Sequence, residues 1–91
     1  MFLTLATAVA MPEFVGNDLD VARSKLAWEA AVACTGREGK TTPRVNVERG
    51  IPPIEWAAAV AIHDDKGVVS RIILREGVPP AILAHEIGHA W

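Results

Sequence analysis

The sequence contains a single cysteine, which excludes a disulfide bond within the chain. Because Cys34 has no partner for an internal disulfide, the composition is typical of a protein from a reducing compartment, and we expect a cytoplasmic location. Free cysteines usually behave as small buried hydrophobic residues. We therefore expect Cys34 to be buried at the end of the helix that contains it, without a catalytic role.

Basic residues are slightly fewer than acidic ones and are scattered along the chain. Nine Lys and Arg residues stand against eleven Asp and Glu residues, which gives a formal net charge of -2. No stretch gathers the basic side chains that neutralise phosphates, so we do not expect nucleic acid as a partner.

Long apolar runs are also missing. No segment reaches the roughly 20 consecutive apolar residues that span a bilayer, which excludes a membrane span. The segment Phe2 to Ala10 is apolar and ends in small residues, like an export signal, but it lacks the positive charges that precede such a signal. We expect it to form a first strand or helix that packs on the domain.

The composition is otherwise that of a globular protein, because hydrophobic residues make up 51% of the chain and charged residues 22%. A length of 91 residues allows one domain and is too short for two separate cores. We therefore treat residues 1–91 as a single domain. Trp28, Trp56 and Trp91 are expected to be packing residues, with Trp91 exposed where its helix ends.

The segment from Asn17 to Thr35 has a helical pattern. Asn17 or Asp18 can cap the first turn, and Gly36 can adopt the left-handed conformation that ends a helix. The apolar stripe predicted to be buried consists of Leu19, Ala22, Leu26, Ala30 and Ala33, widened by Val21, Trp28 and Val32.

Three strands and a second helix are predicted downstream. Val45 and Val47 alternate with polar residues as in a half-buried strand that stops at Gly50. The turn residues 64–67 join two apolar arms, Trp56 to His63 and Val68 to Arg75, into a hairpin. A helix begins at Pro79-Pro80, since proline is tolerated in a first turn, and carries Ile82, Leu83 and Ile87 toward the core. The expected fold class is α+β.

The last helix carries the run His85-Glu86-Ile87-Gly88-His89. Residues four apart lie on one face of a helix, so His85 and His89 can bind one ion, and neutral imidazole is a good ligand for zinc (Zn²⁺). Glu86 is placed to accept the proton of a zinc-activated water, which makes it the candidate general base.

This run resembles the active-site helix of the zincin superfamily of zinc metallopeptidases, which carry the HExxH motif. The resemblance implies a backing helix packed on a small twisted sheet, an edge strand, a return strand and the active-site helix. Asp18 to Cys34, Trp56 to Ile62, Val69 to Leu74 and the helix from Pro80 are similar to these elements. It also implies that residues 57–61 align a peptide substrate. The run 82–89 is similar to small intracellular members of the ImmA/IrrE and SprT-like kinds.

Zincins take a third ligand, His, Glu or Asp, from sequence after this helix, and here only Ala90 and Trp91 follow. Three explanations stay open: the chain is the N-terminal part of a longer domain, a partner or second copy supplies the ligand, or His63, Glu76 or Asp64 completes the site. We expect the first. His63 lies at a strand end, where a solvent-facing histidine needs no special role.

The sequence thus predicts a zinc-dependent peptidase that acts on a peptide or protein, with His85 and His89 as metal ligands and Glu86 as the catalytic residue. Because the third ligand is missing, a zinc-binding or regulatory interaction module without turnover is an alternative. A structural α+β domain with an accidental motif is a third reading.

Overall fold

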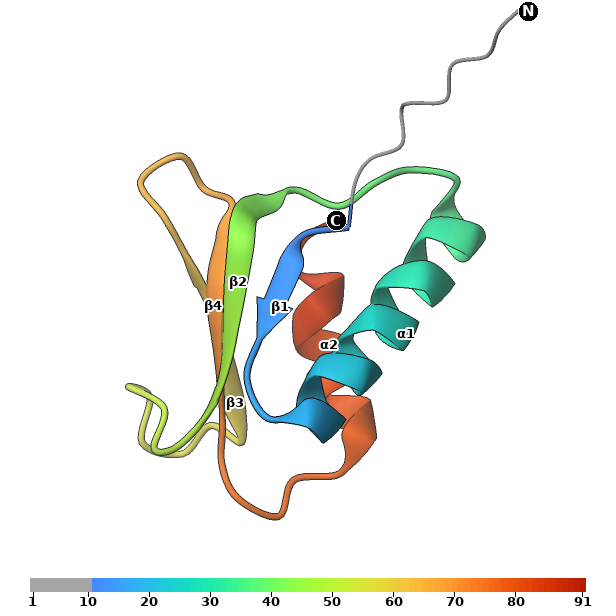
Figure 1. Ribbon diagram of the computed structural model, residues 1–91. Coiled ribbons are helices and arrows are strands. Elements are labelled where there is room, and N and C mark those ends of the chain that lie inside the picture. Colours follow the sequence, from blue (N-terminus) through green and yellow to red (C-terminus); the bar gives the residue numbers. More distant parts are fainter. Residues whose placement is uncertain (1–10) are drawn as a thin grey trace, which may run out of the picture.

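A computed structural model describes residues 11–91 and shows an α+β fold with two helices and a four-stranded mixed sheet (Figure 1). The fold class is the predicted one, but the strand at Glu13–Val15 was not predicted. The elements follow the order β1 (Glu13–Val15), α1 (Asp18–Thr35), β2 (Thr41–Arg49), β3 (Ala59–His63), β4 (Val69–Leu74) and α2 (Pro80–Gly88). The segment Phe2 to Ala10, expected to form a first strand or helix, lies outside the described residues. Within residues 11–91, neither helix is long and apolar enough to cross a bilayer.

The strand order in the sheet is β1-β2-β4-β3. β1 pairs with β2 and β2 with β4 in parallel, whereas β3 pairs with β4 antiparallel and has no second neighbour in the part of the chain that the structure describes. The predicted hairpin is confirmed, because β3 and β4 flank the turn that ends at Gly67, whose φ is 79°. Its first arm begins at Ala59 rather than Trp56.

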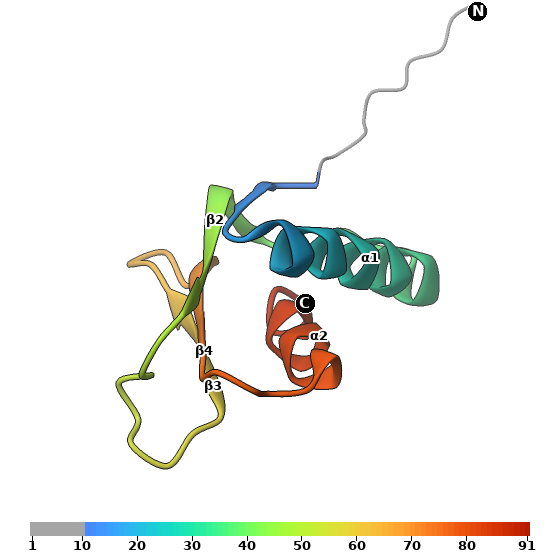
Figure 2. The same ribbon diagram turned by 60° about the horizontal axis from the view of Figure 1, so that its bottom comes forward.

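Both helices cover the same face of the sheet, as Figure 2 shows. β2 follows the predicted alternation, since Val45 and Val47 are buried while Arg44 is exposed. From α2, Leu83 and Ile87 are buried as expected. The core lies between the sheet and the two helices and contains Phe14, Trp28, Val45, Val47, Val69, Ile72, Leu74, Leu83, Ile87 and Ala90.

The ends of α1 are as predicted. Asn17 is the N-cap and accepts a hydrogen bond from the Asp20 amide, and Gly36 ends the helix with a φ of 70°. The buried face is not the predicted one, because Leu19 and Leu26 are 57% and 66% exposed. The predicted burial of Trp28 is confirmed, with Val21 and Val32 partly buried, and Asp20 and Ser24 are buried on the same helix.

Contacts with distant side chains explain which face of α1 is buried. Trp28 packs against Phe14 and Trp91, with ring centroids 6.2 and 4.7 Å away, and buries more apolar area than a leucine would. Asp20 is buried because Arg49 neutralises it. Cys34 lies on the exposed side of the last turn, so the expectation that it is buried is wrong.

The chain end packs into the fold, which corrects the expectation of an exposed Trp91. Its indole nitrogen donates a 2.9 Å hydrogen bond to the carbonyl oxygen of Arg37, and its ring is half-buried. The amide of Lys40 donates to the carbonyl of Ala90 at 2.7 Å. These contacts fasten the end of α2 to the connection between α1 and β2, and so fix the position of α2.

Candidate metal centre

The packing of α2 sets the direction of its polar side chains. Pro80 begins the helix, and the N-cap Pro79 is extended, as a residue before proline prefers. Leu83 and Ile87, four residues apart, are buried against the sheet and α1 and fix the rotation of the helix about its axis. His85 and His89 therefore lie on the exposed side.

His85, Glu86 and His89 come together as the sequence predicts. One potential ligand atom from each lies within 4.8 Å of the others. The two imidazole rings are perpendicular, with centroids 5.0 Å apart and planes at 89°. Nε2 of His89 lies 3.9 Å from Oε1 of Glu86.

These distances are compatible with one metal ion after small side-chain rotations. Two ligands of tetrahedral zinc, each about 2.1 Å from the ion, stand about 3.4 Å apart, so atoms spread over 4.8 Å must approach one another. Rotation about the χ angles of two exposed imidazoles supplies that approach without moving the backbone. The donor set of two imidazoles and a carboxylate suits zinc.

Glu86 differs from the two histidines in its surroundings. Its side chain is 9% exposed, whereas that of His89 is 49% exposed. A carboxylate in this position loses most of its water and faces the imidazoles. Glu86 can act as a proton acceptor beside the ion or as a further ligand.

A cleft of about 320 Å³ runs in front of these three side chains. Its other wall is the free edge of the sheet, formed by Ala59, Val60 and Ala61 of β3. Arg75 donates its amide hydrogen to the carbonyl of Ala58 at 3.0 Å. By the alternation of an antiparallel ladder, Ala59 and Ala61 then direct their amide and carbonyl groups away from β4, toward the open edge.

Of the three upstream groups considered as a third ligand, one lies in this cleft. His63, at the end of β3, lines it, yet His63 is not part of the cluster of ligand atoms. Asp64 accepts hydrogen bonds from the amides of Lys66 and Val68 and stabilises the hairpin turn. The hydrogen bonds with Asp20 chiefly raise the pKa of Arg49, and the charge of Glu76 adds to that effect; Glu76 is not part of the cluster of ligand atoms.

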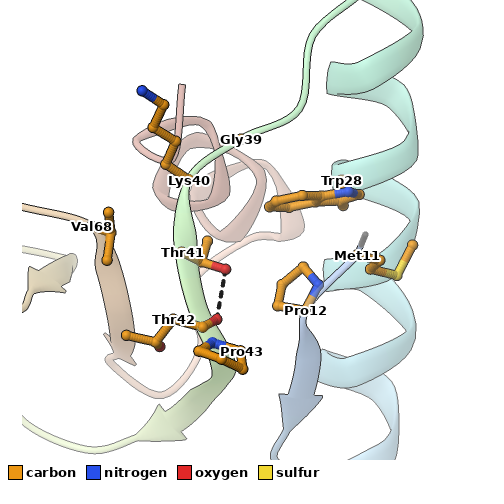
Figure 3. A pocket seen from close by; sticks show the side chains of 9 residues that line it. All are labelled: Met11, Pro12, Trp28, Gly39, Lys40, Thr41, Thr42, Pro43 and Val68. Atoms are coloured by element: carbon orange, nitrogen blue, oxygen red, sulfur yellow. Dashed lines mark hydrogen bonds between the residues drawn. The ribbon is translucent and has the colours of Figure 1, made fainter. Parts of the chain in front are cut away.

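A larger hollow, of about 610 Å³, lies elsewhere, between β1, β2 and α1 (Figure 3). Trp28, Met11, Pro12 and residues 39–43 line it, and its titratable group is Lys40. Its described lining residues include no pair of groups able to bind a metal or transfer a proton. Its greater volume therefore does not make this hollow the candidate functional site.

Sequence reasoning missed the loop that completes the cleft, residues 50–58. Ile54 and Trp56 of this loop line the cleft together with the histidines. Trp56 was expected to be a packing residue at the start of a strand, but it precedes the strand and is 87% exposed. Pro52-Pro53, shortly before it, was the signal that the strand could not begin so early. A comparison with known proteins finds no matching family model, no matching curated protein and no matching solved structure.

Proposed function

We propose that this chain is a zinc-dependent peptidase domain of the zincin type. The observation that carries the proposal is the meeting of His85, Glu86 and His89 in one cleft with the free edge of β3. A metal-binding group alone is common on protein surfaces. A metal-binding group facing an unpaired strand is arranged for a peptide, because an extended peptide can pair with that edge.

The arrangement of elements supports the same proposal. The zincin resemblance calls for a backing helix, an edge strand, a return strand and the active-site helix, in that order. α1, β3, β4 and α2 stand in this order, β3 is at the edge, and both helices cover one face of the sheet (Figure 2).

In the proposed mechanism His85 and His89 hold the metal through imidazole nitrogens, and β3 aligns the peptide. Zinc, when bound, would lower the pKa of a water to about 7 and polarise the scissile carbonyl. Glu86 would accept a proton from a water whose oxygen forms a bond to the scissile carbonyl carbon, and would deliver that proton to the leaving amine nitrogen as the C–N bond breaks.

The proposal requires a third protein ligand, because catalytic zinc sites use three. Within residues 11–91, the group of ligand atoms contains only His85, Glu86 and His89. Additional sequence or a second copy of the chain would supply the third. The alternative function is a zinc-binding interaction module without turnover. It is favoured by the presence of only two imidazole ligands in the described cluster, because a catalytic site uses three protein ligands.

The test measures zinc affinity and cleavage of internally quenched peptides, over a range of protein concentrations that exposes a shared site. We expect Glu86→Gln to lose activity by about 1000-fold and to keep its zinc affinity, since the glutamate is assigned to proton transfer. Glu29→Gln, an exposed change on α1, is the matched control and should behave as the parent.

Three outcomes are informative. Zinc-dependent cleavage that Glu86→Gln abolishes supports the peptidase. Zinc binding without cleavage at any concentration refutes the peptidase for this chain and supports the interaction module. If zinc does not bind more tightly to the parent than to His85→Ala, the motif is accidental.

A further inference from the structure

The loop of residues 50–58 exposes large apolar side chains beside the candidate metal centre. Ile51 is 80% exposed, Ile54 41% and Trp56 87%. They are three of the six large hydrophobic residues exposed within residues 11–91. Exposed apolar residues normally stand singly over a protein surface. Three of them in one loop are therefore typical of a binding surface.

The backbone around Trp56 is held in place. The guanidinium of Arg75 donates to the carbonyl of Ala57 at 2.7 Å and also to the carbonyl of Glu55. The amide of Ala57 donates to the carbonyl of Ile54 at 3.0 Å. One side chain from the end of β4 therefore fixes the loop on both sides of Trp56, and the indole stands on a defined backbone.

The cleft that Ile54 and Trp56 line is nearly free of charge. Among residues 11–91, no lysine or arginine lines it, and Glu86 is the single acidic residue that does. Its remaining walls include Ala59, Val60 and Ala61, whose side chains are small or apolar. Against Ile54 and Trp56, a charged ligand side chain would lose hydration without gaining a partner from these two residues, whereas an apolar side chain would only lose unfavourable contact with water.

We propose that Ile54 and Trp56 form an apolar subsite that takes a large uncharged side chain, aromatic or branched aliphatic, of a peptide aligned along β3. The inference rests on the proposed function, because it assigns the substrate class of the same cleft. Trp56 is the specificity-determining residue: its ring offers a broad apolar face at little cost in conformational entropy. Arg75 is a positioning residue that acts through the loop backbone.

The test measures peptide binding by calorimetry in the zinc-loaded Glu86→Gln chain, so that turnover does not interfere. The probes are three blocked pentapeptides, Gly-Ala-X-Ala-Gly, in which X is phenylalanine, alanine or glutamate. We expect the phenylalanine peptide to bind about fivefold more tightly than the other two. The preference should disappear in Trp56→Ala and largely persist in Trp56→Phe.

Ile51→Ala provides the matched control, because Ile51 belongs to the same loop and is exposed but does not line the cleft. It should keep the preference. Equal binding of the three peptides, a preference that survives Trp56→Ala, or no measurable binding of the phenylalanine peptide would each overturn the subsite.

The two proposals fail separately. If the phenylalanine preference depends on Trp56 but the chain with Glu86 cleaves none of the peptides, the subsite stands and the peptidase does not. If the chain cleaves all three equally well, and Trp56→Ala cleaves as the parent does, the peptidase stands and the subsite is refuted.

Discussion

The carboxylate of Asp20 and the guanidinium of Arg49 form a bidentate ion pair that joins α1 to the end of β2, with N···O distances of 2.8 and 2.9 Å. The Asp20 side chain is 1% exposed and that of Arg49 20%. Arg49 also donates to the carbonyl of Arg75 at 3.0 Å, next to the loop that lines the cleft. One buried pair thus connects the backing helix, the sheet and the wall of the candidate site.

This pair predicts a loss of stability in acid. The hydrogen bonds from Arg49 hold the pKa of Asp20 below its ordinary value, against the opposing effect of burial. A lowered folded-state pKa means that the stabilisation is present above the unfolded-state pKa, about 4, and is lost as pH falls through the folded value. We expect Asp20→Asn to lower the free energy of unfolding by about 3 kcal/mol at pH 7, and this difference should narrow below about pH 4.

Urea unfolding at a series of pH values measures this effect. Glu48→Gln is the control, because Glu48 pairs with Arg71 at 2.8 Å between half-exposed side chains, and such pairs contribute little. A loss in Glu48→Gln as large as that in Asp20→Asn would contradict the importance given to the buried pair.

A second prediction concerns the fastening of α2. A methyl group at Gly39 would meet the Trp91 ring at 2.8 Å and Cβ of Ala90 at 2.9 Å, closer than packed atoms approach. We expect Gly39→Ala to lower the free energy of unfolding by about 1–3 kcal/mol through overpacking. Thermal unfolding measures it, and Gly50→Ala, where a methyl meets nothing within 4 Å, should not show this loss. Equal stabilities of the two variants would show that the chain end does not pack as described.

The three histidines should differ in their effect on zinc binding. His85→Ala and His89→Ala should each weaken zinc affinity by more than about 100-fold, because each removes a direct ligand. His63→Ala should leave the affinity unchanged, since His63 lines the cleft without joining the ligand cluster. Competition with a chromophoric chelator measures all three. A comparable loss in His63→Ala would make His63 the third ligand.

Cys34 provides a test of the exposed side of α1. Because the residue is exposed in the folded chain, an aromatic disulfide reagent should modify one thiol per chain in native buffer, without denaturant. Cys34→Ser should show no modification and an unchanged free energy of unfolding. Modification that appears only after unfolding would restore the original expectation that Cys34 is buried.

Predictions from the sequence were correct where the determining contact is local. Asn17 caps the amide of a residue three positions on, and Gly36 ends the same helix because its left-handed φ needs no distant partner. The hairpin turn depends on Asp64 and Gly67 within one short segment. The helical spacing of His85 and His89 is equally local, so their proximity was predictable.

The buried face of α1 was not predictable in this way. Leu19 and Leu26 are as hydrophobic as core residues, and nothing in their own segment shows that they are exposed. Asp20 is buried only because Arg49, 29 residues away, neutralises it. A hydrophobicity pattern treats an aspartate as a surface residue and therefore points to the wrong face.

The sequence was sufficient to predict the two helices, both ends of α1, the hairpin and the spacing of His85, Glu86 and His89, because each depends on bonds and angles within a few residues. The C-terminal end of the last helix was expected at Trp91, but α2 ends at Gly88. The tertiary structure was needed to show that Trp56 lines the cleft with the histidines and that Trp91 packs on Trp28. Those relationships depend on parallel pairing and side-chain packing between distant segments, whose energies no local pattern encodes.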